Sequence, residues 1–548
     1  MYPIQSPRSG ENDVNREEKN RKLFSGLCLF LAIVSFFLFA IPNAKASENL
    51  AMIQIFEPDE AALYPVISEM ARPKGDLITF LKQFIVYGRY NKGLPFYGPS
   101  ALLLLILRMM GFGEDFPIIF LTLRQFISVL PMLCGLYLLV KMQDGFRTYR
   151  SVLVFLFLLI VPATMYNGFW WHTDGLTLLL SVLVLYFLFK DNLQFGKYFY
   201  LSAIACGVLT ATKVMGPFFF LTVAIVLILG LVNKQITFRR ALGLGLSYFV
   251  IMAASFVISN PFLFSKWGRA GYFNMIRSQM SSLSSGYGVV YEKGVVAAWP
   301  SIRKYFGEAA FLIASLVICI YGIILNKNRF LNLLILSWFI PLTIYVLFFS
   351  HFKYQYWLPV ALPILSSWIQ VFPDKFSGWT KNHREFVRIG FILIFLFQYI
   401  LFIKQSTRTY IARIYRAENN PSIQFYDIVV EELSPLIEKP LRVYYDYRLY
   451  VPNGANWSLH TAYDPLSYRD IEEGNFDVLL LIEQRVRDYL NPDIKGIDPE
   501  QFSQVQRFYY DVDRENVNGY KLIARNDIGL IFVNQEFCGV YFSEEQCR

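Results

Sequence analysis

Long apolar runs separated by short polar loops dominate the chain from residue 23 to residue 404. Several of these runs approach the ~20 residues that a helix needs to cross a bilayer. The pattern therefore predicts a mainly α, polytopic membrane protein with about eleven transmembrane helices. The first is expected at 23–43, and the later ones at 117–140, 151–166, 175–190, 198–212, 215–233, 241–259, 300–325, 330–350, 355–372 and 388–404.

The first loop after the membrane is expected to contain interfacial helices. Apolar residues recur at helical spacing over Leu77–Ile85, with polar residues off that face. This spacing is typical of a helix that lies flat in the membrane interface. The apolar stretch Pro99–Gly111 is shorter than a full span and contains Arg108, so it either crosses the membrane or lies flat.

Basic residues in the later loops decide between these alternatives. If Pro99–Gly111 lies flat, the basic loops face the cytosol, as the positive-inside rule requires, and if it crosses they all face outward. We therefore expect a flat helix, a cytosolic N-terminus and an outer C-terminus. Residues 1–22 have mixed charge and no apolar period, which predicts a disordered cytosolic tail. The basic residues of these loops are Lys141, Arg147, Arg150, Lys190, Lys197, Lys234, Arg239, Arg240, Lys327, Arg329, Lys375, Lys381, Arg384 and Arg388.

Residues 405–548 are more charged and less apolar than residues 23–404, the expected transmembrane module. Short strand-like runs and turn signals predict a small extracytoplasmic α/β domain. Cys538 and Cys547 would lie outside the reducing cytosol, so we expect a disulfide between them, two free thiols being the alternative. Strands are expected at Leu441–Asp446, Asp477–Ile482, Lys521–Arg525 and Gly529–Asn534, and a helix at Ile423–Glu438.

The composition supports a membrane location. The 548 residues are 55% hydrophobic and only 17% charged, a balance that would leave apolar surface exposed in a soluble domain. The net charge of +9 raises the question of nucleic-acid binding. However, the basic residues are spread over short loops, where they set topology. We expect membrane lipids and no nucleic acid as partners.

Two adjacent carboxylates, Asp59 and Glu60, follow Pro58 in the first outer loop. A helix start is the alternative interpretation, because acidic residues suit the first turn of a helix. A carboxylate can act as a general base or hold a divalent ion. Asp59 and Glu60 are therefore the candidate catalytic residues. Asp59 and Asp174 are the candidate ligands of a divalent metal, Mg²⁺ or Mn²⁺, although Asp174 also suits an N-cap.

Cationic side chains are expected at the same outer level. Lys213 lies between two apolar runs, where a lysine costs ~2.5–3.5 kcal/mol at the bilayer centre, and snorkelling is the alternative to an anionic partner. Arg124 lies within an apolar stretch, where it either contacts substrate or pairs with a carboxylate. Cations at this depth suit the phosphate of a lipid whose tail stays in the bilayer. The candidate substrate-binding residues are Lys213, Lys353, Tyr354, Arg124, His172 and Asp174.

The order of these features resembles the lipid-sugar-dependent glycosyltransferases of the GT-C fold class. More closely, it resembles bacterial relatives of protein O-mannosyltransferases and aminoarabinose transferases. The resemblance covers about residues 23–404, and the order and spacing of its pieces give it specificity. The matching pieces are Pro58-Asp59-Glu60, Pro162 followed by Thr173-Asp174, Leu209-Thr210-Ala211-Thr212-Lys213, Asn260-Pro261-Phe262, and Phe352-Lys353-Tyr354 before Leu358-Pro359.

This resemblance implies a GT-C enzyme in which Asp59 is the catalytic residue and a polyprenyl-phosphate sugar is the donor. Relatives usually carry Arg-Tyr where this chain has Lys353-Tyr354, which replaces a bidentate fork by a point charge. The expected function is inverting transfer of a hexosyl or pentosyl group to a lipid, glycan or protein acceptor at the outer face of the cytoplasmic membrane. A transporter or flippase of lipid-linked sugars is the alternative, and it would place ionisable residues near mid-bilayer on broken helices.

Overall fold

The computed structural model of the chain describes residues 8–73, 75–325, 328–373, 383–452, 456–538 and 540–543, with backbone alone at 8–15, 287 and 383–385. Its first element, α1 (Arg8–Lys45), contains the expected first crossing. The helix begins at Arg8, so the described part of the tail for which we expect disorder is helical. A Glu18–Lys22 pair, 2.7 Å apart at i,i+4 spacing, contributes to this helical extension. Residues 1–7 lie outside the described residues.

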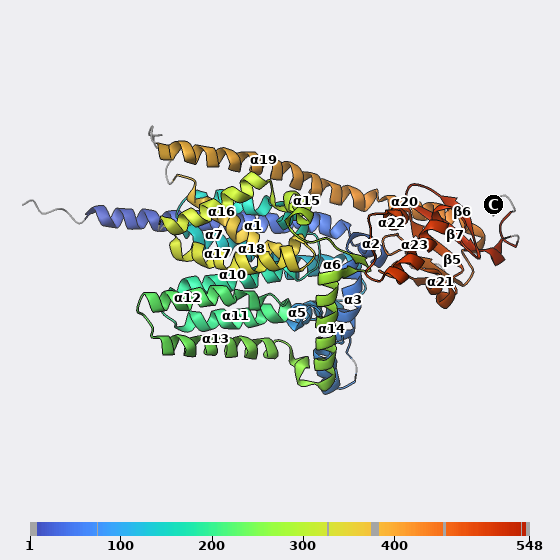
Figure 1. Cartoon of the computed structure of the whole chain (residues 1–548), viewed down its shortest axis with the longest axis horizontal. Helices are drawn as coiled ribbons and strands as arrows, with labels where there is room; N and C mark the ends of the chain where they lie inside the picture. Colours follow the sequence, from blue (N-terminus) through green and yellow to red (C-terminus); the bar gives the residue numbers. More distant parts are fainter. Residues whose placement is uncertain are drawn as a thin grey trace, which may run out of the picture.

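A bundle of apolar helices makes up most of the molecule (Figure 1). Each expected crossing overlaps a helix of this bundle. The longer elements are α6 (Phe116–Leu123), α7 (Leu130–Asp144), α8 (Arg150–Ile160), α10 (Asp174–Asp191), α11 (Lys197–Thr212), α12 (Phe220–Val232), α13 (Phe238–Ile258), α16 (Ala309–Ile324), α17 (Arg329–Ile344), α18 (Tyr354–Ser366) and α19 (His383–Glu418). The shorter ones are η1 (Arg124–Val129), α9 (Pro162–Asn167), η2 (Gly216–Phe219), η3 (Pro261–Phe264), α15 (Val295–Phe306), η4 (Tyr345–Phe349) and η5 (Ser367–Gln370).

By length and composition, five helical segments among the described residues suffice to cross a membrane. A sixth is added if α15 and α16, which are bent by 82°, form one broken span. These helices make the chain a multi-pass membrane protein, but this count stays below the expected eleven crossings. The five segments are Arg16–Lys45, Phe116–Asp144, Phe238–Ile258, Arg329–Phe349 and Phe386–Glu432.

Aromatic packing fixes the bundle interior. The ring of Trp338 on α17 stacks on Phe219 of η2, with centroids 3.8 Å apart. Its indole N–H donates to the carbonyl of Pro359 on α18, 3.0 Å away. The indole N–H that would be costly to bury without a partner is therefore satisfied inside an apolar core.

Several helices lie at the end of the bundle that faces the C-terminal domain, and α3 and α14 run across it (Figure 1). The predicted helix at Leu77–Ile85 is confirmed as α4, and Leu77 and Ile78 keep 71% and 62% of their surface exposed. Such an exposed apolar face is what an interfacial helix requires. The elements here are α2 (Leu50–Phe56), α3 (Pro58–Met70), α4, α5 (Leu94–Met109), α14 (Lys266–Ser285), β1 (Gly286–Tyr287) and β2 (Val289–Val290).

The C-terminal part folds around a five-stranded sheet of order β4-β3-β5-β7-β6. β3 pairs in parallel with β4 and β5, whereas β7 pairs antiparallel with β5 and β6. The four predicted strands are confirmed as β3 (Leu441–Tyr445), β5 (Val478–Ile482), β6 (Tyr520–Arg525) and β7 (Gly529–Asn534). The predicted helix appears as α20 (Pro421–Glu432) followed by η6 (Ser434–Leu436). β4 (Trp457–His460), α21 (Tyr468–Gly474), α22 (Glu483–Leu490), α23 (Pro499–Asp513) and η7 (Gln535–Phe537) were not predicted.

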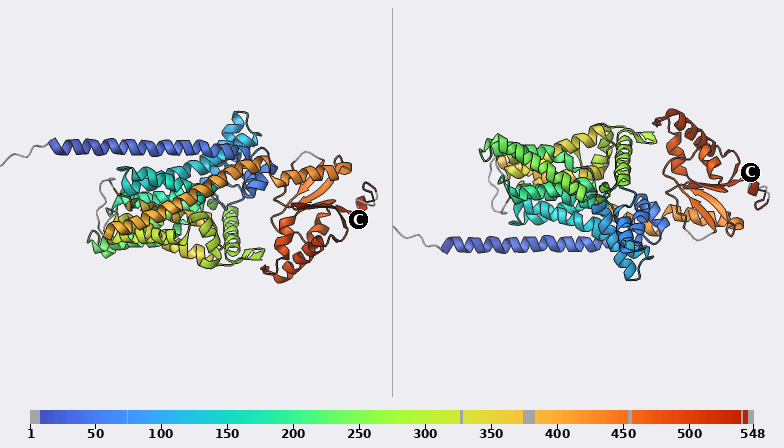
Figure 2. Two further views of the ribbon diagram at one scale, coloured as in Figure 1. Left: turned by 90° about the horizontal axis from the view of Figure 1, so that it is seen from above. Right: turned by 90° about the horizontal axis from the view of Figure 1, so that it is seen from below.

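Helices cover both faces of this sheet. Phe425 and Val429 of α20 pack on one face, and Val486, Val505 and Phe508 of α22 and α23 pack on the other. The N-terminal end of α1 and this domain lie at opposite ends of the molecule (Figure 1), and α19 runs obliquely along one side of the bundle toward the domain (Figure 2). Cys538 is disulfide-bonded, while its expected partner Cys547 lies outside the described residues.

Candidate active site

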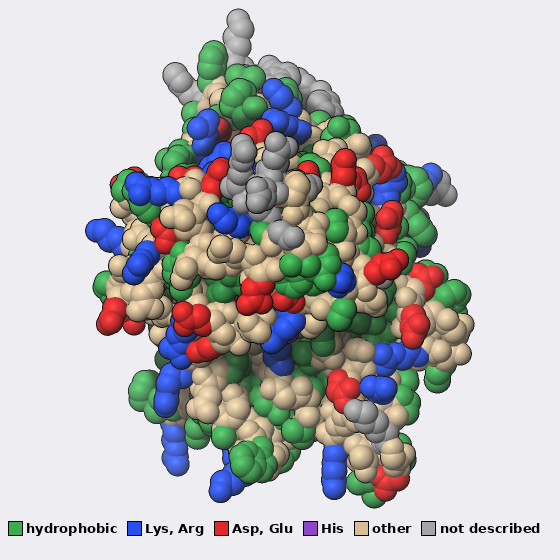
Figure 3. Space-filling view, turned by 90° about the vertical axis from the view of Figure 1, so that its right-hand side faces the viewer, with side chains coloured by type: hydrophobic (Ala, Val, Ile, Leu, Met, Phe, Trp, Pro, Cys, Tyr) green, Lys and Arg blue, Asp and Glu red, His purple; other side chains and the backbone are tan. Residues whose placement is uncertain are grey.

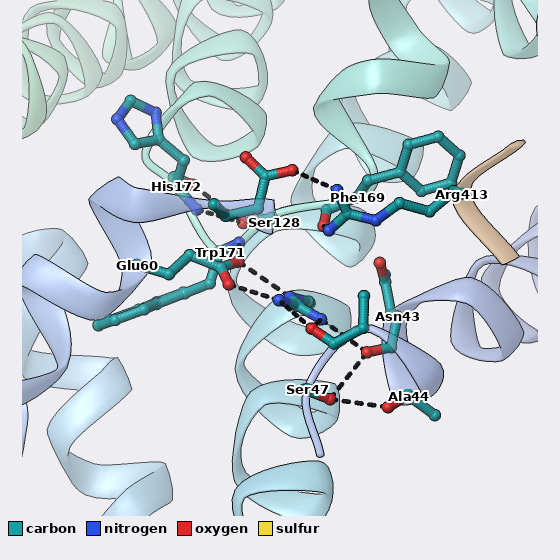
Figure 4. A network of polar contacts seen from close by, with 12 residues as sticks. Asn43, Ala44, Ser47, Glu60, Ser128, Phe169, Trp171, His172 and Arg413 are labelled. Carbon is teal, nitrogen blue, oxygen red and sulfur yellow. Dashed lines mark hydrogen bonds and ion pairs between the residues drawn. The ribbon is translucent and has the colours of Figure 1, made fainter. Parts of the chain in front are cut away.

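Glu60 lies in the first turn of α3 and is fully buried. Arg124 of η1 pairs with both of its oxygens, with Nε–Oε1 at 2.9 Å and Nη2–Oε2 at 2.5 Å. The backbone N–H of Trp171 also donates to Oε1. Arg124 further donates to the carbonyls of Asn43 and Ala46 near the end of α1. This buried pair therefore joins α1, α3, η1 and the loop before α10 (Figure 4).

A second carboxylate of the same stretch also has a cation as its partner. Glu57 pairs with Arg413 of α19 at 2.6 Å. Arg413 also donates to the carbonyl of Phe169 and lies over the ring of Phe56. Burial raises the pKa of Glu57 to about 7, against the opposing charge of Arg413. The pair holds α19 against the start of α3.

Four ionisable side chains form a continuous line beside these pairs. Lys213 Nζ lies 2.5 Å from Asp174 Oδ1, and Asp174 Oδ2 accepts from Nδ1 of His172. Nε2 of the same imidazole lies 2.5 Å from Nζ of Lys92. A neutral imidazole with its proton on Nδ1 fits both contacts, since Nε2 then accepts from Lys92. Asp174 and His172 are buried.

The loop that carries His172 is held from two sides. The Ser128 hydroxyl donates to the carbonyl of His172 and accepts from its backbone N–H. Gly175 lies so close to η1 that a Cβ atom there would be 2.1 Å from the carbonyl oxygen of Ser128. Above the loop, the ring of Trp170 stacks on His172 with centroids 4.1 Å apart. η1 is a π-helical turn, an element that often marks functional sites.

Lys92 reaches this line because of its neighbour Gly93. Gly93 has φ +66°, and a Cβ atom there would be 1.9 Å from the carbonyl oxygen of Ala211. Only glycine fits such a position without strain. The buried amide of Asn260, one of the residues that carry the family resemblance, accepts from the backbone N–H of Leu94 at 3.4 Å. The loop of Lys92 is thereby fixed against the segment that leads to Lys213.

Lys353 completes a group of three lysines. Its Nζ lies 5.9 Å from the ring centroid of Tyr356, and Lys213 Nζ lies 4.0 Å from the same centroid. The neighbouring Tyr354 stacks instead on Tyr305, with centroids 4.1 Å apart. Lys92, Lys213 and Lys353 thus face a common region, whereas Tyr354 belongs to an aromatic cluster beside it.

Asp59 differs from Glu57 and Glu60 because it is exposed and makes no hydrogen bond or ion pair with the described residues. It lies within electrostatic reach of the lysine group. Burial and then Lys213 lower the pKa of Lys92 to about 8, while Asp59 and Asp174 oppose this. Burial also lowers the pKa of Lys353. Two negative charges act in the opposite direction, and that of Asp59 has the larger effect. A free carboxylate therefore adjoins three buried or half-buried lysines.

The C-terminal domain reaches the same place. The hydroxyl of Tyr463 donates to the carbonyl of Pro58, 2.7 Å away and next to Asp59. Tyr445 and Tyr450 of this domain bond to Gln54 and Asn49 around α2. The site therefore lies where the bundle meets the C-terminal domain.

The side chains that the structure describes do not by themselves form a metal site. Among the described residues there is no group of three or more His, Cys, Asp or Glu side chains placed to hold an ion. Both oxygens of Asp174 are already bonded, one to a lysine ammonium. Divalent Mg²⁺ and Mn²⁺ prefer several oxygen ligands, which the described side chains around Asp59 and Asp174 do not supply.

The predicted residues separate into two groups in the structure. Lys213, Lys353, His172 and Asp174 come together near Asp59, whereas Arg124 and Glu60 pair with each other inside the protein. The sequence analysis missed Lys92, Tyr356 and the Glu57–Arg413 pair. The adjacent glycine in Asn91-Lys92-Gly93 was the available signal for Lys92, since a glycine in a loop often marks a close approach of two backbones.

Comparison with known proteins shows the fold. The chain is similar to ArnT from Cupriavidus metallidurans in the apo state, with TM-score 0.50, 13% identity, and coverage of 93% of this chain and 97% of that one. ArnT from the same organism bound to undecaprenyl phosphate gives TM-score 0.49, 12% identity, and 95% and 100% coverage. The oligosaccharyltransferase AglB from Archaeoglobus fulgidus, in complex with an inhibitory peptide and a dolichol-phosphate, gives TM-score 0.45, 13% identity, and 93% and 74% coverage.

The expected GT-C fold is confirmed by the likeness to apo ArnT. At 13% identity this likeness concerns the fold alone. No protein-family model matches the chain. No curated protein matches it either.

Proposed function

We propose that this protein is a glycosyltransferase that moves a sugar from a polyprenyl-phosphate donor to an acceptor at the outer face of the cytoplasmic membrane. The observation that carries the proposal is the convergence of Lys92, Lys213 and Lys353 beside the unbonded carboxylate of Asp59. A phosphate needs cations, and an acceptor hydroxyl needs a base. The lysine cations and the carboxylate that could act as the base lie together at the end of an apolar bundle. The likeness in fold to ArnT is in keeping with this chemistry.

The lysine group would hold the phosphate of the donor. Lys213 and Lys353 both lie over the ring of Tyr356, and Lys92 joins them through His172 and Asp174. Asp174 offsets part of their mutual repulsion and fixes Lys213 in position. As the bond between the sugar and the phosphate breaks, negative charge grows on the phosphate oxygen. Preorganised cations stabilise charge that develops in this way.

Asp59 would be the general base. It would take the proton of the acceptor hydroxyl while the hydroxyl oxygen attacks the anomeric carbon. The bond from that carbon to the phosphate oxygen breaks, and its electron pair leaves with the polyprenyl phosphate. A single displacement of this kind inverts the anomeric centre. Asp59 suits the role because its carboxylate is exposed and has no partner among the described residues.

Glu60 and Arg124 would position this site rather than contact the substrate. Their pairing leaves neither side chain available, and it fixes the first turn of α3, from which Asp59 projects. His172 and Tyr354 would line the site through their stacked rings. The divalent metal expected at Asp59 and Asp174 has no role in this scheme, because the donor set does not fit one.

We propose the membrane orientation that the positive-inside rule predicts from the sequence. The N-terminus would be cytosolic, the bundle would lie in the inner (plasma) membrane, and residues 405–548 would be extracytoplasmic. The acceptor would be a lipid, a glycan or a protein on that side. The transporter alternative receives less support, because the described ionisable groups of the site gather at one end of the bundle, near Tyr463 of the C-terminal domain.

The function is tested by comparing glycans from cells with and without the protein by mass spectrometry, followed by an assay of the purified protein. The protein is added to membranes that lack it, together with a radiolabelled polyprenyl-phosphate sugar. We expect the label to enter an acceptor and free polyprenyl phosphate to appear. A protein that moves the labelled donor across a bilayer without consuming it would instead be a flippase.

A further inference from the structure

The C-terminal domain has a cavity of about 260 Å³ of its own. It lies at the carboxyl ends of the parallel strands β3 and β4, the edge at which open α/β sheets bind ligands. At this volume it fits a single ring better than a drug-sized molecule. Its lining includes Tyr444, His460, Asp464, Leu466, Asp470 and Phe476.

Aromatic rings form the walls of this cavity. The Phe476 ring lies 5.5 Å from the rings of both Tyr444 and His460, measured between centroids. Aromatic rings in a cavity present flat apolar faces, on which the C–H side of a sugar ring can pack. Leu466 adds to the apolar lining. These walls favour a flat, partly apolar ring over a free inorganic ion.

Two carboxylates lie at the rim, and one of them has no partner. Asp464 is exposed and makes no hydrogen bond or ion pair with the described residues. Asp470 uses Oδ2 to accept from the backbone N–H and the hydroxyl of Ser467 at the start of α21. Its other oxygen remains for a ligand. Carboxylates accept hydrogen bonds from hydroxyl groups strongly.

An unsatisfied polar group supports a ligand independently of these carboxylates. Tyr444 is only 2% exposed, yet its hydroxyl makes no hydrogen bond with the described residues. It lies near the buried Asp446–Arg485 pair. Buried hydroxyls normally have a partner, and one that lacks it calls for an explanation. A polyhydroxylated ligand in the cavity would supply that partner.

One loop lines the cavity and also contacts the stretch that carries Asp59. Its lining includes Ala462 and Asp464, and Tyr463 between them donates to the carbonyl of Pro58, next to Asp59. Arg485 fixes the same loop by donating to the carbonyl of Tyr463 at 2.8 Å. A group held in the cavity would thus lie one loop away from Asp59. On the end of the molecule formed by the C-terminal domain, acidic and basic side chains are interspersed (Figure 3).

We propose that this cavity is a sugar-binding subsite of the C-terminal domain, and that it holds a sugar unit of the acceptor near Asp59. The inference that a sugar ring binds here rests on the cavity alone. Its role as part of the acceptor rests on the proposed function.

The test measures sugar binding without relying on transfer. The full-length protein in nanodiscs is titrated with glucose, mannose, galactose and N-acetylglucosamine, and binding is followed by saturation-transfer NMR. Tyr444→Phe removes only the unpartnered hydroxyl, and Asp464→Asn removes only an exposed charge. We expect the wild type to bind at least one of these sugars and each variant to bind it about tenfold more weakly. Asp470 is unsuitable for substitution because it caps α21.

Matched controls lie on the opposite face of the sheet. Tyr426→Phe and Asp427→Asn make the same chemical changes on α20, and their binding should equal that of the wild type. The subsite is overturned if both cavity variants bind sugar as tightly as the wild type does, or if no sugar binds to the wild type. It is also overturned if the wild type binds only a cationic probe, lysine methyl ester, and none of the sugars. Asp59→Asn should bind the sugar normally while losing transfer. If it instead keeps transfer, the proposed catalytic role fails but the subsite stands.

Discussion

Asp59 and Glu60 are neighbours in the first turn of α3, but their environments are opposite. Glu60 is fully buried, and Arg124 pairs with both of its oxygens. Asp59 is exposed and unbonded among the described residues, on the side of the lysine group. The same turn of helix thus carries a structural carboxylate and, next to it, one that is free to react.

The first prediction concerns catalysis by Asp59. Asp59→Asn keeps the size of the side chain, but the amide cannot take a proton at neutral pH. We expect the transfer rate to fall ~10²–10⁴-fold, as when a positioned base is removed, with donor binding and apparent Tm unchanged. The measurement is label transfer by purified protein. Activity close to that of the wild type would move the base to another residue, most directly to Asp174.

The second prediction concerns Glu60. Glu60→Gln leaves the Arg124 guanidinium buried without a counter-charge, which typically costs ~3–5 kcal/mol. We expect a large fall in apparent Tm in detergent. The double variant Glu60→Gln/Arg124→Met should recover part of the loss, because it removes the unpaired charge as well. If the double variant loses as much as the sum of the two single variants, the two residues are not coupled.

Much of the fold followed from the sequence because its determinants are local. The apolar runs at 117–140 and 241–259 overlap α6–α7 and α13, and the run of β-branched and aliphatic residues at Gly529–Asn534 is β7. β4 was missed because Trp457–His460 is short and mixes polar with apolar residues, which leaves no clear period. The start of α1 at Arg8 was missed because charged pairs at i,i+4 spacing can extend a helix that apolar periodicity does not mark.

The site was harder to predict because its contacts are distant in sequence. Glu60 and Arg124 are 64 positions apart, and Glu57 and Arg413 are 356 apart. The sequence left open whether Arg124 contacts substrate or pairs with a carboxylate, and only the tertiary packing brings Glu60 to it. Lys92 was missed because the adjacent Gly93 can indicate a close approach of two backbones, but it does not indicate that the other backbone is that of Ala211.

The third prediction concerns the phosphate contact of Lys213. Lys213→Met keeps the apolar stem and loses the charge, while Asp174 retains its contact with His172. We expect binding of polyprenyl phosphate to weaken at least about tenfold, the loss of one charge-assisted contact. Lys234→Met, an exposed lysine between α12 and α13, is the matched control and should bind normally. Unchanged binding by Lys213→Met would favour snorkelling as the account of this lysine.

The fourth prediction is a pH dependence set by Lys92. Because the pKa of Lys92 is lowered to about 8, its charge is present below that pH and is lost above it. Binding of polyprenyl phosphate should therefore weaken as the pH rises through about 8. Lys92→Arg stays charged throughout this range and should lose the step, whereas Lys92→Met should bind weakly at every pH. A step that persists in Lys92→Arg would belong to another group.

The last prediction tests how Lys92 is positioned. Gly93 and Gly88 both have positive φ, +66° and +81°, but only Gly93 lies against another backbone. An alanine at either position incurs the same kind of conformational strain. At Gly93 the new Cβ would also overlap the carbonyl oxygen of Ala211, at 1.9 Å, whereas at Gly88 no atom lies within 4 Å. Gly93→Ala must therefore push its loop away from the segment that leads to Lys213.

We expect Gly93→Ala to lower both apparent Tm and affinity for polyprenyl phosphate, and Gly88→Ala to cause only a small loss of apparent Tm. Thermal unfolding and phosphate binding are measured on the same preparations. The pH step assigned to Lys92 should also shrink in Gly93→Ala, because the lysine would no longer lie against His172. Equal effects of the two substitutions would mean that backbone strain alone matters and that the approach to Ala211 does not position Lys92.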